Sequence, residues 1–224
     1  MFHFPNSKHV STWLLSTIIM VVLMILIGGV TRLTDSGLSM VEWRPLWGFL
    51  PPTSEIEWKR VFELYMNSPE YIFKNNGMSL EEFKEIFFWE YFHRLWGRLI
   101  GIVFIIPMLF FIILKKIPKS ILSKLFIILF LGGLQGFIGW WMVKSGLVND
   151  PSVSQYRLTI HLSNALLILS LLIWVYLEIK EGVSQIKPDF SFFMFSILFI
   201  TIIAGAFVAG MDAGLMYNEY PLMG

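Results

Sequence analysis

The sequence predicts an all-α integral membrane protein, with a four-helix transmembrane bundle and a fifth span that begins a second, repeated bundle. Hydrophobic residues make up 56% of the 224 residues and charged residues only 15%, whereas a soluble domain carries about 25% charged residues. Five stretches are apolar over about 20 residues, the length that a helix needs to cross a bilayer. In addition, the sequence that ends the first stretch recurs after the fifth.

Composition also excludes several classes of protein. The chain has no cysteine, which rules out a disulfide framework, a Cys-ligated zinc site, an iron–sulfur cluster and a cysteine nucleophile. Its net charge is +1 and its basic residues form no stripe, so nucleic acid is not an expected partner. The high hydrophobicity excludes a disordered chain.

The spans follow from uninterrupted apolar runs. The first is longer than the apolar core of a typical signal peptide, and no small-residue cleavage site follows it, so we expect a retained helix. The second extends backwards through a helix that carries His93, Arg94 and Arg98. The predicted spans are 10–30, 99–114, 125–143, 158–177 and 190–211.

The basic residues of the short loops predict the orientation. Lys and Arg are retained on the cytoplasmic side of a membrane, and short loops carry most of the lysines: Lys8, Lys115, Lys116, Lys119, Lys124, Lys180 and Lys187. These segments share one side if the N-terminus is cytoplasmic. The long loop 31–90 then lies outside. Within it, residues 55–66 and 79–88 have helical apolar spacing, and Ser79 with Glu82 forms a predicted capping box. We expect two amphipathic helices near the outer membrane surface.

An internal repeat links the two ends of the chain. Asp35-Ser-Gly-Leu38 follows the first span, Asp212-Ala-Gly-Leu215 follows the fifth, and Glu42 and Glu219 lie equally far beyond these motifs. Chance similarity of glycine-rich span ends is the alternative interpretation. We predict that span five repeats span one as a parallel copy. The predicted domains are 1–189, which includes the outer loop 31–90, and 190–224, the start of a second unit.

Two histidines are the strongest sign of chemistry. His93 and His161 lie near the outer ends of spans two and four, at the same predicted depth. Ionisable residues within spans are rare and usually functional, and two neutral imidazoles from different helices can ligate a haem iron axially. Alternatively, both are polar histidines bonded to backbone or water. We expect them to share one site.

Glu90 precedes His93 by three residues, so both project from one helix face. Its carboxylate can perform acid–base chemistry on a substrate held by His93, or it can orient His93 as a hydrogen-bond partner. The same spacing occurs in di-iron bundles, which need further carboxylates. Span four contains no glutamate within its apolar run, so we reject a di-iron site.

Arginines gather at the same end of the spans. Arginine recognises carboxylates in bidentate fashion, and haem carries two propionates. The candidate propionate contacts are Arg32, Arg98 and Arg157. Snorkelling to lipid headgroups is the alternative, and we favour it for Arg94.

Glycines in the third and second spans predict close helix contacts. Gly132, Gly133, Gly136 and Gly139 recur at helical spacing, and Gly97-x-x-x-Gly101 resembles a small-residue interface; such faces let helices pack closely. Close approach to a flat cofactor is the alternative. In the third span, Gln135 is expected to bond across the bundle.

These motifs together resemble the haem A synthase family, in its cysteine-free proteobacterial and mitochondrial branch. The resemblance covers nearly the whole chain. The matching stretches are Gly28-Gly-Val-Thr-Arg-Leu-Thr-Asp-Ser-Gly-Leu-Ser-Met40, Glu90-Tyr-Phe-His-Arg-Leu-Trp-Gly-Arg98, Gly132-Gly-Leu-Gln-Gly-Phe-Ile-Gly-Trp-Trp-Met-Val-Lys-Ser-Gly-Leu147 and Val153-Ser-Gln-Tyr-Arg-Leu-Thr-Ile-His-Leu162.

The resemblance implies an oxidoreductase that converts haem O to haem A for cytochrome oxidase, by oxidising the porphyrin C8 methyl to a formyl group. It implies two four-helix halves, with the substrate haem O held between His93 and His161 and with Glu90 important for activity. The second half would hold haem b between two further histidines. Because the sequence ends at Gly224, we expect a C-terminally truncated chain that is incomplete alone.

The resemblance also implies partners and a location. Expected partners are the lipid bilayer, haem O, haem O synthase, an electron donor, and either a second copy or a separate second half. The expected location is the bacterial inner membrane, in preference to the mitochondrial one. Two other functions stay open: a bis-histidine b-type cytochrome, which needs no catalytic glutamate, and a non-catalytic haem carrier or assembly subunit.

Overall fold

The computed structural model describes residues 7–43, 49–148, 151–182, 188–216, 219 and 222. These residues form helices without strands. The helices are α1 (Ser7–Leu33), α2 (Glu55–Met66), α3 (Pro69–Phe73), α4 (Leu80–Ile113), α5 (Lys119–Gly146), α6 (Gln155–Glu181), α7 (Phe190–Gly210) and α8 (Ala213–Met216).

Five of these helices, α1, α4, α5, α6 and α7, are long and apolar enough to cross a membrane. The predicted all-α fold and its five spans are therefore confirmed. The orientation of the chain across the membrane stays a prediction. Of the residues that carried it, Lys187 lies outside the described residues.

The second predicted surface helix is wrong. Residues 79–88 do not form a separate helix, because no glycine or proline interrupts the chain between them and His93. They begin α4, which has 34 residues and is about 51 Å long, well beyond the ~30 Å hydrocarbon core of a bilayer. The predicted capping box is confirmed at its start, where Ser79 and Glu82 bond reciprocally. The short α3, which begins at Pro69, was not predicted.

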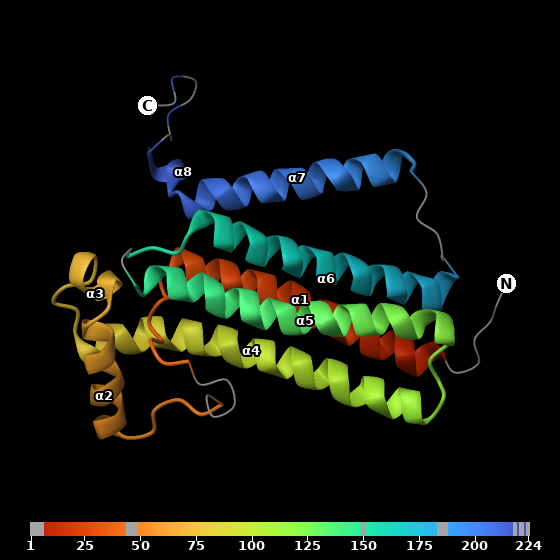
Figure 1. The fold of residues 1–224 in the computed structure, drawn as a ribbon, viewed down its shortest axis with the longest axis horizontal. Helices are drawn as coiled ribbons and strands as arrows, with labels where there is room; N and C mark the ends of the chain where they lie inside the picture. The colour runs from red at the N-terminus through yellow and green to blue at the C-terminus, as the bar shows by residue number, and fades with distance from the viewer. Residues whose placement is uncertain are drawn as a thin grey trace.

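Helices α1, α4, α5 and α6 lie side by side as an elongated bundle, and α7 lies along α6 on the side away from α4 (Figure 1). Helix α1 packs against both α4 and α6, and α5 packs against α6. We call the end of the bundle that carries α2 and α3 the loop end; α1 and α5 end there, and α4 and α6 begin there.

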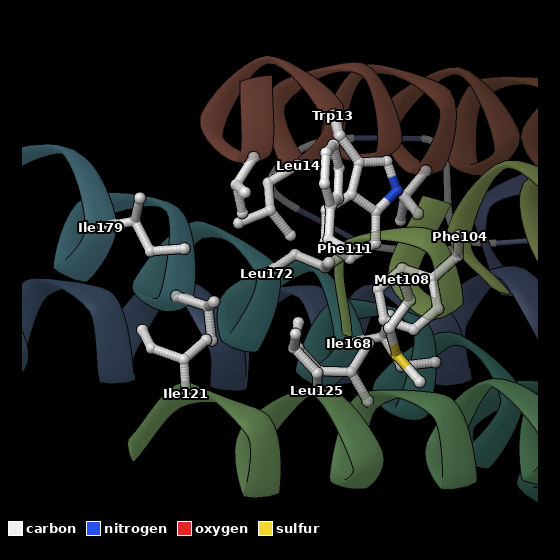
Figure 2. Packing of buried hydrophobic residues seen from close by; sticks show 14 residues of the cluster. Trp13, Leu14, Phe104, Met108, Phe111, Ile121, Leu125, Ile168, Leu172 and Ile179 are labelled. Carbon is white, nitrogen blue, oxygen red and sulfur yellow. The ribbon is translucent and has the colours of Figure 1, made fainter. Parts of the chain in front are cut away.

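The core of the bundle is apolar and lies toward the end opposite the loop end. Side chains from all four helices converge there, including Trp13, Leu14, Phe111, Leu125 and Leu172 (Figure 2). Each is at most 8% exposed. Because this half of the bundle is filled with hydrocarbon, the polar residues with candidate functions lie in the other half.

A proline in α4 explains one of the contacts between helices. Pro107 has no N–H, so it leaves the carbonyl of Val103 without its usual helical donor. The indole Nε1 of Trp13, on α1, donates to that carbonyl at 2.8 Å. A second indole, Trp96 Nε1 on α4, donates to the carbonyl of Met20 on α1 at 2.9 Å. These two bonds fix α1 against α4.

The loop end has a small core of its own. Tyr65 of α2 and Phe83 and Phe87 of α4 are buried together. The ring of Trp58 meets that of Phe87 edge-on, with centroids 5.1 Å apart. Amphipathic α2 therefore packs against the extension of α4 through aromatic rings. It lies across the bundle at this end (Figure 1).

The motif Asp35-Ser-Gly-Leu38 closes the loop end. Asp35 has a φ of 48°, in the left-handed region that aspartate tolerates better than most residues. The chain turns there, and Leu38, which is 2% exposed, packs onto Gly146 at the end of α5. A β-carbon on Gly146 would lie 2.6 Å from Leu38 Cδ1. Any larger residue at position 146 would therefore displace Leu38.

Asp212, in the equivalent position of the second copy of this motif, has nearly the same backbone conformation, with a φ of 52°. Arg32 joins the two copies. Its guanidinium pairs with Asp35 and with Asp212, and it also donates to the carbonyl of Ala209. Most of the further repeat, 44–48 and 217–224, lies outside the described residues.

Candidate functional site

His93 of α4 faces α1. A β-carbon on Gly28 of α1 would lie 3.4 Å from His93 Nε2. The imidazole thus lies at van der Waals distance from the glycine face of α1. Gly28 lies five residues before the end of α1, about 8 Å along its axis.

His161 of α6 faces α5 in a similar way. A β-carbon on Gly139 would lie 3.0 Å from its Cε1. Gly139 lies seven residues before the end of α5 and His161 six residues after the start of α6, about 9–11 Å from the loop end. Both histidines therefore lie at a similar depth, each against a glycine of a neighbouring helix.

The two imidazoles belong to different helices at this shared depth. They come from opposite sides of the bundle interior, His93 from the α1–α4 pair and His161 from the α5–α6 pair. Neutral imidazoles that converge on one interior in this way can bind a metal from two sides.

A chain of amides holds His161. Gln135 Nε2 lies 3.3 Å from His161 Nε2 and donates to the His161 carbonyl at 3.1 Å. The Gln135 Oε1 accepts from Asn164 Nδ2 at 2.7 Å, so Gln135 bonds across the bundle as expected. His161 Nδ1 is buried, and no described residue hydrogen-bonds to it.

Glu90 is buried, with 2% of its surface exposed, and its carboxylate accepts hydrogen bonds from three groups. Ser39 Oγ and Met40 N both donate to Oε2 at 2.7 Å. Arg94 Nη2 donates to Oε1 at 2.5 Å. Among the described residues, no hydrogen bond joins Glu90 to His93. No direct contact among the described residues therefore supports the prediction that Glu90 orients His93.

None of Glu90's three partners was predicted from the sequence. Arg94 lies four residues after Glu90, the spacing of a helical ion pair, so that signal was present in the sequence. Ser39 lies 51 residues before Glu90, and no local pattern relates the two. The outer segment reaches Glu90 because Leu38 anchors it on α5.

The three arginines predicted to contact propionates are in different surroundings. Arg32 is engaged by Asp35 and Asp212. Arg157 donates to the carbonyl of Trp141 at 2.7 Å and lies 4.4 Å from the centroid of its ring. Arg98 lies 5.3 Å from the ring centroid of Phe49. Arg32 and Arg157 therefore have clear roles in holding helices together.

Only part of the predicted glycine packing face is in contact with another helix. Gly139 lies against His161. A β-carbon on Gly97 would lie 3.3 Å from the methyl carbon of Met24. The other glycines of the two motifs have no described neighbour within 4 Å of such a β-carbon: Gly101, Gly132, Gly133 and Gly136. For these four, helix packing within this chain is not the explanation.

The fold and the site define a class: a multi-pass helical membrane protein with two histidines and a buried carboxylate in one half of a four-helix bundle. Within that class, the chain belongs to the cytochrome oxidase assembly protein family, which matches residues 11–224. The resemblance found in the sequence is thereby confirmed. No solved structure matches the chain.

Curated relatives in this family are named haem A synthase. The chain is 49% identical over 228 residues to that of Nitrosospira multiformis, 47% over 225 to that of Granulibacter bethesdensis and 48% over 222 to that of Maricaulis maris. These alignments cover 98%, 97% and 97% of this chain but 64%, 60% and 65% of the relatives. The chain thus spans less than two thirds of their length. With five spans and bacterial relatives, it is a multi-pass protein of the bacterial inner membrane.

Proposed function

We propose that this chain supplies the substrate-haem half of a haem A synthase, an oxidoreductase that converts haem O to haem A. The single observation that carries the proposal is that His93 and His161 lie at a similar depth, each against a glycine of a neighbouring helix, in the half of the bundle that holds the buried Glu90. The name of the relatives, haem A synthase, supports the reaction. If the oxygen comes from water, converting a methyl to a formyl group removes four electrons and releases four protons, so the reaction needs an electron acceptor. If it comes from dioxygen, each of two hydroxylations consumes two electrons and two protons and releases one water, so the reaction needs an electron donor.

The residues fit a haem. Haem iron takes neutral imidazole nitrogens as axial ligands, and His161 Nδ1 is a buried nitrogen to which no described residue hydrogen-bonds. Gly28 and Gly139 have no side chain to block the rings. His93 and His161 would hold the iron, with Gln135 released from His161 Nε2 if that nitrogen binds. When bound, the haem supplies the redox chemistry for oxidising its unactivated methyl.

Glu90 is the proposed catalytic residue. Three donors hold its carboxylate in one orientation. A carboxylate fixed in this way can stabilise positive charge that develops nearby or accept a proton. In this proposal Arg94 and Ser39 position Glu90, and neither contacts the reacting atoms.

The test is a chimera in which these 224 residues replace the matching segment of the Nitrosospira multiformis relative. It is expressed in cells that make haem O but lack their own haem A synthase, and extracted haems are separated by chromatography. We expect haem A from the parent chimera. Glu90→Gln should retain bound haem but lower haem A production at least about 100-fold, the scale of a lost acid–base group.

Outcomes of this test separate the candidate functions. Haem A production by Glu90→Gln at the parent level would remove Glu90 from the mechanism. Bound haem without haem A in the parent chimera would indicate a b-type cytochrome or a haem carrier. Glu63→Gln, an exposed glutamate of α2, is the matched control and should leave haem A production unchanged.

We also propose that α7 begins a second unit, and that domain 1–189 is the first. The shared conformation of Asp35 and Asp212 supports this repeat. By the resemblance, the part of the relatives that this chain does not match would hold haem b. Haem O synthase, an electron donor, and a second copy or separate second half are the proposed partners.

A further inference from the structure

A pocket of about 190 Å³ lies between α4 and α5 near the loop end. The segment that follows the Asp35 turn closes one side of it. Its lining residues are Met40, Val41, Trp43, Arg94, Trp140, Val143, Lys144 and Leu147. The pocket is therefore built from three segments that are far apart in the sequence.

Two cations line this pocket, each beside an indole ring. The Arg94 guanidinium lies 5.5 Å from the ring centroid of Trp43, and Lys144 Nζ lies 5.3 Å from that of Trp140. The two indoles are 6.4 Å apart. Glu90 already neutralises Arg94, whereas no described acidic residue pairs with Lys144. As far as the described residues go, the pocket thus has one cation, Lys144, beyond the Arg94–Glu90 pair, beside flat apolar rings.

The pocket lies at the same level along the bundle as the two histidines. Arg94 directly follows His93 on α4, and Trp140 directly follows Gly139, the glycine against which His161 packs. Its volume is that of about six water molecules at ~30 Å³ each. That space is too small for a whole cofactor, since small-molecule sites occupy about 300–1,000 Å³, but it suffices for carboxylate side arms.

We propose that this pocket receives the carboxylate side arms of the haem, with Lys144 as the residue that contacts them and Arg94 lining the opposite wall. The proposal rests on the proposed function and adds a specificity-determining residue to it. A carboxylate there would find an ammonium on a flexible stem and additional N–H groups on Arg94. Arg32 and Arg157, which hold helices together, are not needed for it.

The test compares two ligands that differ only in these arms: ferric protohaem and its dimethyl ester. Each is titrated into the full chain in nanodiscs of zwitterionic lipid, and the shift of the Soret band gives the dissociation constant. We expect the chain to bind the free acid about tenfold more tightly than the ester. Lys144→Gln should reduce that preference about 3- to 10-fold, the scale of one charge-assisted bond, and leave the affinity for the ester unchanged.

Two further variants complete the design. Lys144→Arg should restore the preference, because it keeps the charge. Lys119→Gln changes an exposed lysine at the other end of the same helix and should have no effect. Equal affinities for acid and ester, or a Lys144→Gln variant that weakens both alike, would overturn the pocket assignment and show an interfacial lysine only. Failure of both ligands to bind would overturn the proposed function itself.

Discussion

At the scale of single residues, two buried glutamates in the loop-end half of the molecule have different surroundings. Glu90 has three hydrogen-bond donors and belongs to the candidate site. Glu70, in α3, is also buried, with 4% of its surface exposed, but among the described residues only Tyr65 OH donates to its carboxylate, at 2.9 Å. Asn75 Nδ2 in turn donates to Tyr65 OH at 2.7 Å. This second cluster lies outside the spans and serves the fold of the loop end.

The cluster predicts a pH dependence. Burial, which disfavours the charged carboxylate, raises the pKa of Glu70 from 4.5 to about 7 despite the bond from Tyr65. A carboxyl whose pKa is raised on folding binds its proton more tightly in the folded state. Its contribution to stability is therefore complete below about pH 4.5 and is lost as the pH rises to about 7. The contribution of Glu70 to the free energy of unfolding changes by up to about 3 kcal/mol over this pH range.

We predict that amide hydrogen exchange of residues 55–78, corrected for its intrinsic pH dependence, becomes faster as the pH rises from about 5 to about 8. Glu70→Gln should remove this dependence, because glutamine stays neutral and still accepts from Tyr65. Glu63→Gln, on the exposed face of α2, should retain it. The same pH dependence in Glu70→Gln and the parent would exclude Glu70 as its source.

At the scale of helices, the bundle is held by side chains that satisfy backbone groups of their neighbours. Pro107 removes a bond inside α4, and Trp13 of α1 replaces it from outside. An apolar membrane interior offers no water to satisfy an unpaired carbonyl, so such replacements make proline tolerable within a span. The pairing of α1 with α4 thus rests partly on a hydrogen bond that the proline makes possible.

This bond predicts a measurable coupling between Trp13 and Pro107. Trp13→Phe removes the indole N–H and should lower the free energy of unfolding by about 1–3 kcal/mol. In a Pro107→Ala background the cost should be about 1 kcal/mol smaller, because the alanine N–H then bonds to Val103. Equilibrium unfolding in mixed micelles, followed by circular dichroism, measures both costs. Additive effects of the two substitutions would contradict the interpretation that Trp13 supplies the hydrogen bond that Pro107 cannot give to the Val103 carbonyl.

At the scale of the whole molecule, α7 is attached to the bundle at its loop end by polar contacts and along its length by α6. Arg32 donates hydrogen bonds to Asp212 and to the carbonyl of Ala209. Gly210 lies close to Gln155 of α6, because a β-carbon on Gly210 would lie 2.7 Å from Gln155 Cβ. Of the helix, only Ala206 is buried. The small residues of this span therefore make few contacts within the chain.

We predict that Asp212→Asn loosens the end of α7. Hydrogen exchange of residues 205–216 should increase severalfold, because Arg32 loses its charged partner on the second copy of the motif. Asp35→Asn is the matched control: it removes the other carboxylate of Arg32 but leaves the link to α7 intact, and asparagine accepts the left-handed conformation. Equal exchange in both variants would show that Arg32 does not hold α7.

The sequence alone determined the spans and the family, and it marked the histidine pair and Glu90 as candidates, which stay predictions. These features are local: hydrophobic runs, capping residues and residue spacings report on the helix in which they lie. The same locality explains the error at 79–88. A helical pattern shows that a segment is a helix, but it does not show whether that helix lies on the membrane or continues a span.

Tertiary structure decided which distant residues meet. Ser39 donates a hydrogen bond to Glu90, and Leu38 packs on Gly146. Trp13 donates to the carbonyl of Val103, and Lys144 and Arg94 line one pocket. It also decided that Arg32 joins the two copies of the Asp-x-Gly-Leu motif. The physical reason is that each contact depends on which helices pack together and at what register, and this is set by the shapes of whole helix faces rather than by any local pattern.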